Sequence, residues 1–124
     1  MDMPNSGELT FGCEQVSEIL NLVGDKWTMQ VVVSLRDQPR RFNDLKRQVG
    51  GISQQMLTRT LKSLVRDGMA RRTVCATTPP QVEYALTELG QSLSEPVGHL
   101  AKWAVAHIAT IHHNRLRSDA QVAI

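Results

Sequence analysis

Six polar side chains recur at intervals of one, three or four residues, the spacing of one exposed face of a helix. They comprise two amides, one hydroxyl and three cations: Gln54, Gln55, Thr58, Arg59, Lys62 and Arg66. The apolar residues between them fall on the opposite side, as in a helix that packs on a core: Leu57, Leu61, Leu64 and Val65. The pattern predicts a helix that contacts nucleic acid, although a merely solvated polar face would have the same composition.

Positions along this helix predict different roles. The two glutamines and the threonine lie near its start and carry groups that pair with base edges or contact a thymine methyl. Arg59 could reach a guanine or a phosphate. Lys62 and Arg66 lie further along, where we expect them to hold the DNA backbone.

A second, shorter helix is predicted just before this one. Residues 42–49 place three apolar side chains on one side of a helix: Phe42, Leu45 and Val49. Two glycines then form a turn, and Ser53 can cap the free backbone amides of the following helix, which ends at Gly68. Two helices joined in this way are typical of a helix-turn-helix, whose second helix lies in a DNA groove.

Positive charge is concentrated on this part of the chain, although the net charge is only +2. Residues 1–25 contain five acids and no lysine or arginine, whereas residues 26–72 contain eleven bases against three acids. Such a surface neutralises phosphates, so Ser53 and three cations at or within the preceding helix are further candidate DNA contacts: Arg40, Arg41 and Lys46. Arg41 could instead pair internally with Asp44.

After Gly68 the pattern changes from helical to alternating, which predicts a β-hairpin with strands at residues 69–75 and 81–86. Hairpins beside a DNA-binding helix commonly touch DNA through a basic tip, yet the turn at residues 76–80 carries no charge. Thr77 and Thr78 could still donate to phosphates. Arg71 and Arg72 are adjacent in a strand and must point to opposite faces, so at most one is expected to meet DNA.

The remaining segments predict a mainly helical chain. We expect a loose arm over residues 1–12, one domain over residues 13–113 and a tail over residues 114–124. A helix after Cys13 has four apolar residues at helical spacing: Val16, Ile19, Leu20 and Val23. Another begins at Asp25 and ends before Pro39. A long helix from Thr87 carries an apolar stripe: Leu89, Leu93, Val97, Leu100, Ala104, Ile108 and Ile111.

The ordered set of these motifs resembles the HxlR family of winged helix-turn-helix regulators and is distantly similar to MarR-type repressors. The resemblance runs from Cys13 to about Trp103 and rests on Gly24-Asp25-Lys26-Trp27, Arg41-Phe42-Asn43-Asp44-Leu45, Gly51-Ile52-Ser53, Met56-Leu57-Thr58, Leu61 with Leu64, Asp67-Gly68, Pro79-Pro80-Gln81-Val82-Glu83-Tyr84 and Leu86-Thr87-Glu88-Leu89-Gly90. It implies a homodimeric transcription factor, with repression the expected mode by family analogy.

The two terminal helices predict how such a dimer forms. Each has one apolar side that could pack against a second subunit, although both could instead complete their own core. A two-fold dimer would hold two DNA-reading helices about one DNA turn, roughly 34 Å, apart and would favour an inverted-repeat operator.

Cys13 matches the position at which some HxlR proteins sense electrophiles or oxidants. A thiol at a helix N-terminus has a lowered pKa because free backbone amides stabilise its thiolate, whereas Glu14 and Glu18 oppose this effect. The alternative is a small residue packed in the dimer contact. Cys75 has no counterpart in the family resemblance and is interpreted as a packing residue. Two cysteines in a chain of this length favour reduced thiols, and a disulfide between two Cys13 residues remains a hypothesis.

Several other functions lack the residues that they require. No phosphate loop, nucleophile motif or acid pair indicates an enzyme or a cofactor. The four histidines do not have metal-site spacing, and packing explains Trp27 and Trp103 better than a ligand pocket. No apolar run or leader predicts a membrane segment or export, so we expect a soluble, cytoplasmic protein. The alternatives are a winged-helix protein-interaction module or a small-molecule-responsive regulator without thiol sensing.

Overall fold

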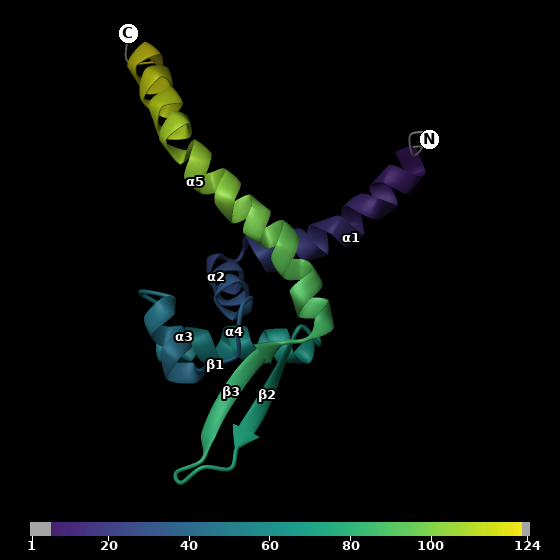
Figure 1. The fold of residues 1–124 in the computed structure, drawn as a ribbon. Coiled ribbons are helices and arrows are strands. Elements are labelled where there is room, and N and C mark those ends of the chain that lie inside the picture. The colour runs from purple at the N-terminus through teal and green to yellow at the C-terminus, as the bar shows by residue number, and fades with distance from the viewer. Residues whose placement is uncertain (1–5, 123–124) are drawn as a thin grey trace.

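The computed structural model describes residues 6–122, with side chains from residue 12 onwards. In this part of the chain it contains five helices and three strands, in the order α1 (Ser6–Gly24), α2 (Lys26–Leu35), β1 (Arg40–Arg41), α3 (Phe42–Gln48), α4 (Gln54–Arg66), β2 (Ala70–Cys75), β3 (Gln81–Leu86) and α5 (Glu88–Val122). Helices α2, α3 and α4 and the sheet form one body, from which α1 and α5 extend on one side and the β2–β3 hairpin on the other (Figure 1). This arrangement confirms the predicted mainly helical fold with a small hairpin.

The core lies between α2, α3, α4 and the first residues of the hairpin. Apolar side chains at helical spacing supply most of it, and eight of them are at most 1% exposed: Val31, Val32, Leu35, Leu45, Val49, Leu57, Leu61 and Leu64. Burial of each such side chain contributes about 1.5 to 3 kcal/mol of transfer free energy. Since three of the leucines belong to α4, most of the polar residues of α4 lie on its outer side, whereas Thr60 is buried with the leucines.

Local capping explains where α2 and α4 begin. The Asp25 carboxylate accepts hydrogen bonds from the backbone amides of Trp27 at 2.8 Å and Thr28 at 3.2 Å. The Ser53 hydroxyl accepts one from the amide of Met56 at 3.0 Å. Gly68 follows α4 with a φ of +76°, a conformation that residues with a Cβ rarely adopt. These features confirm the predicted starts of both helices and the predicted end of α4.

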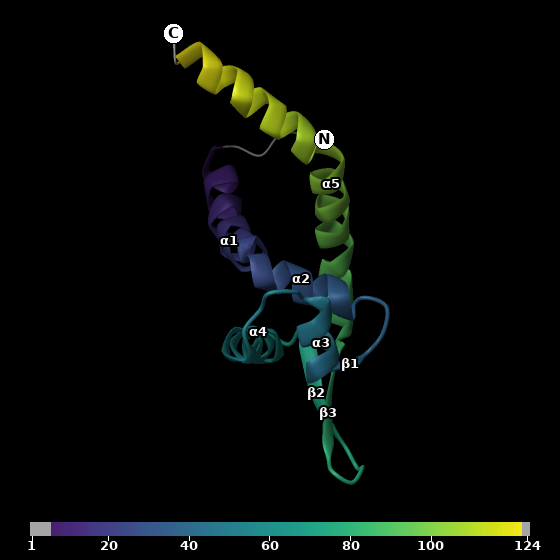
Figure 2. The ribbon, with the colours of Figure 1, turned by 90° about the vertical axis from the view of Figure 1, so that its left-hand side faces the viewer.

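The sheet has three antiparallel strands in the order β1-β3-β2. The two strands of the hairpin were predicted, whereas β1 was not, because it has only two residues and takes its strand conformation from β3. In β1, Arg40 lies opposite Tyr84. The hairpin projects away from the helical body, as the second view shows (Figure 2).

Hydrogen bonds attach the start of α5 to the body. The Thr87 hydroxyl donates to the carbonyl of Gly68 at 2.6 Å and accepts from the amide of Gly90 at 3.2 Å. Further along, the Gln91 side-chain amide donates to the carbonyl of Arg36 at 3.0 Å. The first turns of α5 are therefore tied to the end of α4 and to the end of α2.

Both ends of the described chain differ from the sequence prediction. Helix α1 begins at Ser6, so residues 6–12 are helical instead of a loose arm, and residues 1–5 lie outside the described residues. Helix α5 continues through Pro96 to Val122, so the predicted tail is helical from residue 114 to residue 122. Intrinsic helix propensity is a weak guide to such boundaries, and Gly7 and Gly12 misled the prediction for α1.

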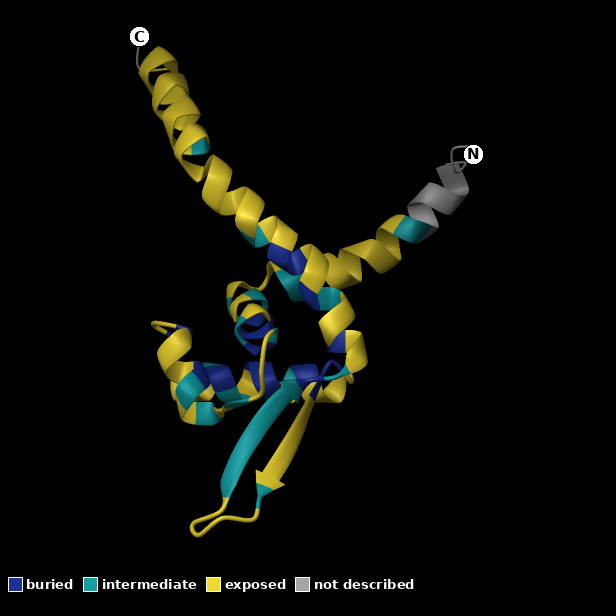
Figure 3. Ribbon diagram, in the orientation of Figure 1, coloured by how far each residue is buried: buried dark blue, intermediate teal, exposed yellow. Residues whose placement is uncertain are grey.

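The apolar sides of α1 and α5 are largely uncovered in the single chain (Figure 3). On α1, Val16 is 54% exposed, Ile19 42% and Leu20 59%. On α5, much of the predicted stripe is also open, and the exposed members are Leu89, Leu100, Ala104 and Ile108. Val65 of α4, predicted to be buried, is exposed as well. Helical periodicity shows that a helix has an apolar side, but it does not show what covers that side.

No helix within residues 6–122 combines the length and the apolar character needed to cross a membrane.

Candidate nucleic-acid interface

The outer side of α4 carries the side chains that the sequence assigned to DNA. Five of the six are exposed: Gln54, Gln55, Arg59, Lys62 and Arg66. Thr58 is half-buried, and its hydroxyl donates to the carbonyl of Gln54 at 2.8 Å. Its proton is therefore used within the helix, which leaves the methyl group and the oxygen lone pairs for an outside partner.

Ser53 has a structural role that precedes any contact with DNA. Because its Oγ accepts from the amide of Met56, this side chain holds the first turn of α4 in place. Its hydroxyl proton stays free to donate to a phosphate oxygen. Both uses are compatible, since the cap needs only the lone pair of the oxygen.

Arg40 is tied to the interior. Its Nε donates to the carbonyl of Ser34 at 2.6 Å, and the residue is only partly exposed. The bond links β1 to the end of α2, so the structure gives Arg40 a role that the sequence did not predict. Lys46 is exposed on α3 and remains available for phosphates.

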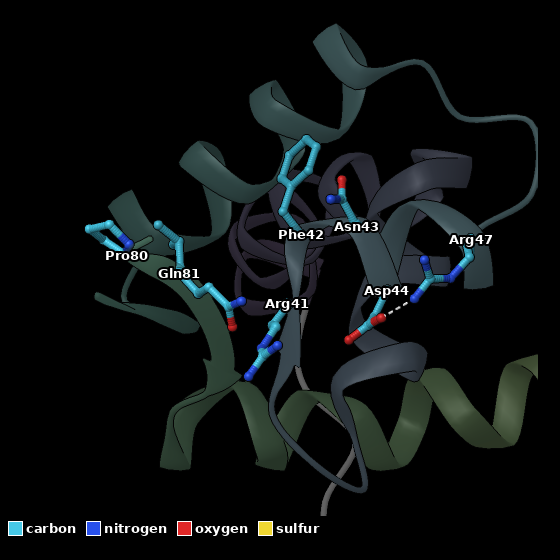
Figure 4. Close-up of a pocket in the computed structure, with 8 residues that line it drawn as sticks. Arg41, Phe42, Asn43, Asp44, Arg47, Pro80 and Gln81 are labelled. Carbon is cyan, nitrogen blue, oxygen red and sulfur yellow. Dashed lines mark hydrogen bonds and ion pairs between the residues drawn. The ribbon is translucent and has the colours of Figure 1, made fainter. Parts of the chain in front are cut away.

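The ion pair between Arg41 and Asp44, which the sequence suggested as an alternative, does not form. Asp44 pairs with Arg47, which lies one turn later in α3. Arg41 is exposed and lines a hollow of about 490 Å³ between the start of α3 and the start of β3. In the close-up, the Asp44–Arg47 pair lies on one side of this hollow and Pro80 and Gln81 on the other (Figure 4).

Arg47 is a candidate contact that the sequence analysis omitted. Its side chain is 74% exposed despite the pair with Asp44. The signal was present, because Lys46 and Arg47 form a basic pair in the last turn of α3. An exposed ion pair contributes little stability, so Arg47 can exchange its partner for a phosphate at small cost.

Arg71 and Arg72 lie on opposite faces of β2, as the alternation of a strand predicted. Arg72 lies opposite Tyr84 and lines a groove beside Lys62 and Arg66 of α4. Arg71 lies opposite Ala85 and lines a different hollow, which also contains Asp37. Of the two arginines, Arg72 is therefore the one beside the polar side of α4.

The tip of the hairpin offers few free donors. The Thr77 hydroxyl donates to the carbonyl of Pro79 at 2.7 Å, so its proton is used within the turn. Thr78 is exposed. With no charge between residues 76 and 80, the tip can contribute at most weak polar contacts to a phosphate backbone.

Cys13 is exposed, but the structure removes one reason for its expected reactivity. It lies seven residues inside α1 and not at the helix N-terminus, so free backbone amides do not surround its thiol. Cys75 is half-exposed at the end of β2. Both cysteines are free.

The histidines do not gather into a metal site. Across the described residues, no three side chains of histidine, cysteine, aspartate or glutamate lie close enough together to hold a metal ion. His107 instead stacks on Trp103, with ring centroids 4.5 Å apart, and its Nδ1 lies 2.7 Å from the Trp103 carbonyl. Trp103 itself is 53% exposed on α5, so it lies on the surface and not in the core of the single chain.

The second helix of the helix-turn-helix carries cations on its outer side, and a β-hairpin that belongs to a small sheet follows it. This arrangement defines a winged helix-turn-helix protein. A family model described as HxlR-like helix-turn-helix matches residues 22–112, and the chain belongs to that family. It is therefore a DNA-binding transcriptional regulator and not an enzyme.

Individual relatives agree with this assignment. The chain is 43% identical over 86 residues to the uncharacterized HTH-type transcriptional regulator YtfH of Escherichia coli, a match that covers 69% of this chain and 68% of YtfH. The solved structure of YtfH from Salmonella typhimurium superposes with a TM-score of 0.75 at 38% identity and covers 81% of this chain and 89% of that one. The redox regulator HypR in its reduced form superposes with a TM-score of 0.74 at 33% identity. The match covers 80% of this chain and 98% of HypR.

Proposed function

We propose that α4 lies in the major groove of an operator and contacts its bases through Gln54, Gln55, Thr58 and Arg59. The observation that carries this proposal is that these side chains face outward: Gln54, Gln55 and Arg59 are exposed, and the Thr58 hydroxyl is bonded only within its own helix. Within residues 12–122 the only ion pair joins Arg47 and Asp44, so the cations of α4 are not neutralised by neighbouring acids. Unpaired guanidinium and amide groups on a rigid helix are the donors that base edges and phosphates require.

Other exposed polar groups around α4 would hold the DNA backbone. Lys62 and Arg66 lie towards the end of α4, and Arg72 lies beside them on the hairpin. On the other side, Arg41, Lys46 and Ser53 would contact phosphates near the start of the helix, with Thr78 as a weak contact at the tip. Contacts on both sides of α4 would fix its register without themselves specifying sequence.

The regulator would act as a homodimer formed by α1 and α5. Exposed apolar side chains on both helices support this proposal, because large uncovered apolar surfaces mark interaction sites. The two helices extend from the body on the side opposite the hairpin (Figure 1). Burial of their apolar sides against a second copy would therefore leave α4 and the hairpin free for DNA.

A two-fold dimer would recognise an inverted repeat with half-sites about one turn, roughly 34 Å, apart. We propose repression as its mode by analogy with the family, since a protein bound over a promoter blocks polymerase without further contacts.

The proposed signal is oxidation or alkylation of Cys13. Its thiol is exposed on α1, three residues before Val16, and so lies beside the apolar side through which the dimer would form. The similarity to the redox regulator HypR is consistent with such a signal. A reaction there would change the packing of α1 in the dimer and hence the spacing of the two α4 helices.

A selection from randomised duplexes tests the DNA-binding part without knowledge of the operator. Reduced protein should enrich a two-fold symmetric sequence, and fluorescence anisotropy with that duplex should show binding that unrelated DNA does not displace. If no sequence is enriched and binding to every duplex is weak and salt-sensitive, α4 does not read bases and a protein-interaction role becomes the better account.

A further inference from the structure

Gln81, the first residue of β3, carries a polar atom that has no partner in the folded chain. Its side-chain oxygen Oε1 is shielded from solvent, and it accepts no hydrogen bond. Among residues 12–122 it is the only shielded side-chain oxygen or nitrogen of a non-exposed residue that lacks a partner. A shielded acceptor without a donor costs free energy, so a group that can donate to Gln81 is expected close by.

The strand register places Arg41 on the same side of the sheet as Gln81. Arg41 of β1 lies opposite Glu83 of β3, so these two side chains point to one face. Residues two apart in a strand also share a face, which adds Gln81 to the same side. Gln81 and Arg41 both line the hollow of about 490 Å³, and in the close-up their side chains extend toward one another (Figure 4).

The guanidinium of Arg41 can supply the missing donor and still bind a phosphate. Arg41 is exposed and forms no ion pair within residues 12–122, where Asp44 pairs with Arg47 instead. A guanidinium carries five N–H groups in a rigid, planar fork. One N–H donated to Gln81 would fix the plane of the fork and leave the other N–H groups for phosphate oxygens.

We propose that Gln81 is a positioning residue for DNA binding, whose amide oxygen accepts a hydrogen bond from Arg41 and turns the guanidinium toward a phosphate. This inference rests on the proposed function, in which Arg41 contacts the DNA backbone. A neutral amide suits this task. A carboxylate such as that of Glu83 would hold Arg41 by neutralising its charge, whereas Gln81 orients Arg41 and leaves the positive charge for the phosphate.

A double-mutant cycle, measured by fluorescence anisotropy on a labelled duplex, tests the coupling of the two residues. Gln81→Met preserves the length of the side chain but removes the acceptor, so it should weaken DNA binding by about fivefold, the value of one hydrogen bond. In a protein that already carries Arg41→Ala, Gln81→Met should have no further effect. Gln38→Met is the matched control, since Gln38 is exposed between α2 and β1, and it should bind DNA as the wild-type protein does.

Two further measurements separate positioning from a structural role. Gln81→Met should leave the salt slope of binding unchanged, since Arg41 still neutralises a phosphate, whereas Gln81→Glu should lower it by about one, because the new carboxylate pairs with Arg41. Without DNA, urea unfolding of Gln81→Met should show no loss of stability, since the oxygen that it removes has no partner in the fold. The positioning role would be overturned by wild-type DNA affinity of Gln81→Met, by a loss that persists beside Arg41→Ala, or by destabilisation of Gln81→Met.

The choice of duplex distinguishes a failure of this inference from a failure of the proposed function. A phosphate contact does not depend on base sequence, so the cycle can be measured on unrelated DNA at low salt as well as on a selected operator. Weak binding to every duplex, with the expected coupling between Gln81 and Arg41, would support the positioning role and refute base reading by α4. Selective binding of an operator that neither Arg41→Ala nor Gln81→Met weakens would do the reverse, and the hollow would then lie outside the DNA interface.

Discussion

Gly90 of α5 approaches Met69 so closely that a Cβ at Gly90 would lie 2.0 Å from the carbonyl oxygen of Met69. That oxygen also accepts the amide of Thr87 at 3.0 Å. The contact lies where α4 has ended, β2 is about to begin and α5 begins. A glycine at this position therefore lets the proposed dimerisation helix pack directly against the backbone of the DNA-binding unit.

Gly90→Ala should destabilise the protein, because the added methyl group meets a backbone atom that cannot rotate away. Overpacking of this kind costs about 1 to 3 kcal/mol, or more when backbone must shift. Urea unfolding measures the loss. Gly50→Ala is the control, since nothing lies within 4 Å of its added Cβ and the change should have little effect. Equal urea midpoints of unfolding for the two variants would show that α5 can move away from Met69 without loss of stability.

Two substitutions of Ser53 should separate its cap from its contact with DNA. Ser53→Ala removes the acceptor for the Met56 amide and should lower the free energy of unfolding by about 1 kcal/mol. Ser53→Asp preserves the cap, so stability should be nearly unchanged, but its negative charge should weaken DNA binding at low salt. Unchanged DNA affinity for Ser53→Asp would place Ser53 outside the interface.

Arg59→Ala should reduce sequence preference, with a loss of about 1 to 3 kcal/mol on the selected operator and little loss on unrelated DNA. The expected result follows if its guanidinium pairs with a base. Anisotropy titrations with both duplexes measure the difference. Equal losses on both would assign Arg59 to the backbone.

Lys62→Ala should weaken binding to all duplexes alike and lower the salt slope by about one, because it removes one phosphate contact. Titrations between low and moderate salt measure this slope. Arg71→Ala is the matched control, since its side chain lies on the far face of β2. If Arg71→Ala lowers the slope as much as Lys62→Ala, the orientation of the hairpin towards DNA is wrong.

Leu20→Glu should convert the proposed dimer into a monomer, because it places a charge on the exposed apolar side of α1. Light scattering gives the molar mass directly. Val74→Glu provides the comparison, since Val74 is 56% exposed on β2, away from both terminal helices, and its substitution should leave a dimer. A wild-type protein with the molar mass of a monomer would refute the proposed dimer.

Oxidation by diamide should join two subunits through Cys13. Two thiols lose two protons and two electrons to the azo group, which becomes a hydrazine, and one disulfide forms. Wild-type and Cys75→Ser proteins should run as linked dimers on a non-reducing gel, and Cys13→Ser as a monomer. If wild-type protein stays a monomer after oxidation, a disulfide between subunits is excluded, and mass spectrometry would show whether Cys13 had reacted otherwise.

The sequence by itself determined the helix-turn-helix and most of its proposed DNA-binding surface. Caps and helix ends depend on residues within about four positions, so Asp25, Ser53 and Gly68 could be interpreted directly. The polar side of α4 followed from helical periodicity, and the opposite orientation of Arg71 and Arg72 followed from the alternation of a strand. Each of these features depends on local geometry.

Only the tertiary structure decided which of these groups come together. Strand β1 forms because Arg40 pairs with Tyr84, which is far away in the sequence. The hydrogen bond from Arg40 to the carbonyl of Ser34 holds this candidate DNA contact against the end of α2. The groove between α4 and Arg72 likewise depends on how the hairpin folds back along the helix. Periodicity predicted that α1 and α5 have apolar sides, but the folded chain shows that those sides remain open. The physical reason is that a local pattern sets the direction of a side chain relative to its own backbone, whereas burial and partners depend on distant segments that the chain brings close only on folding.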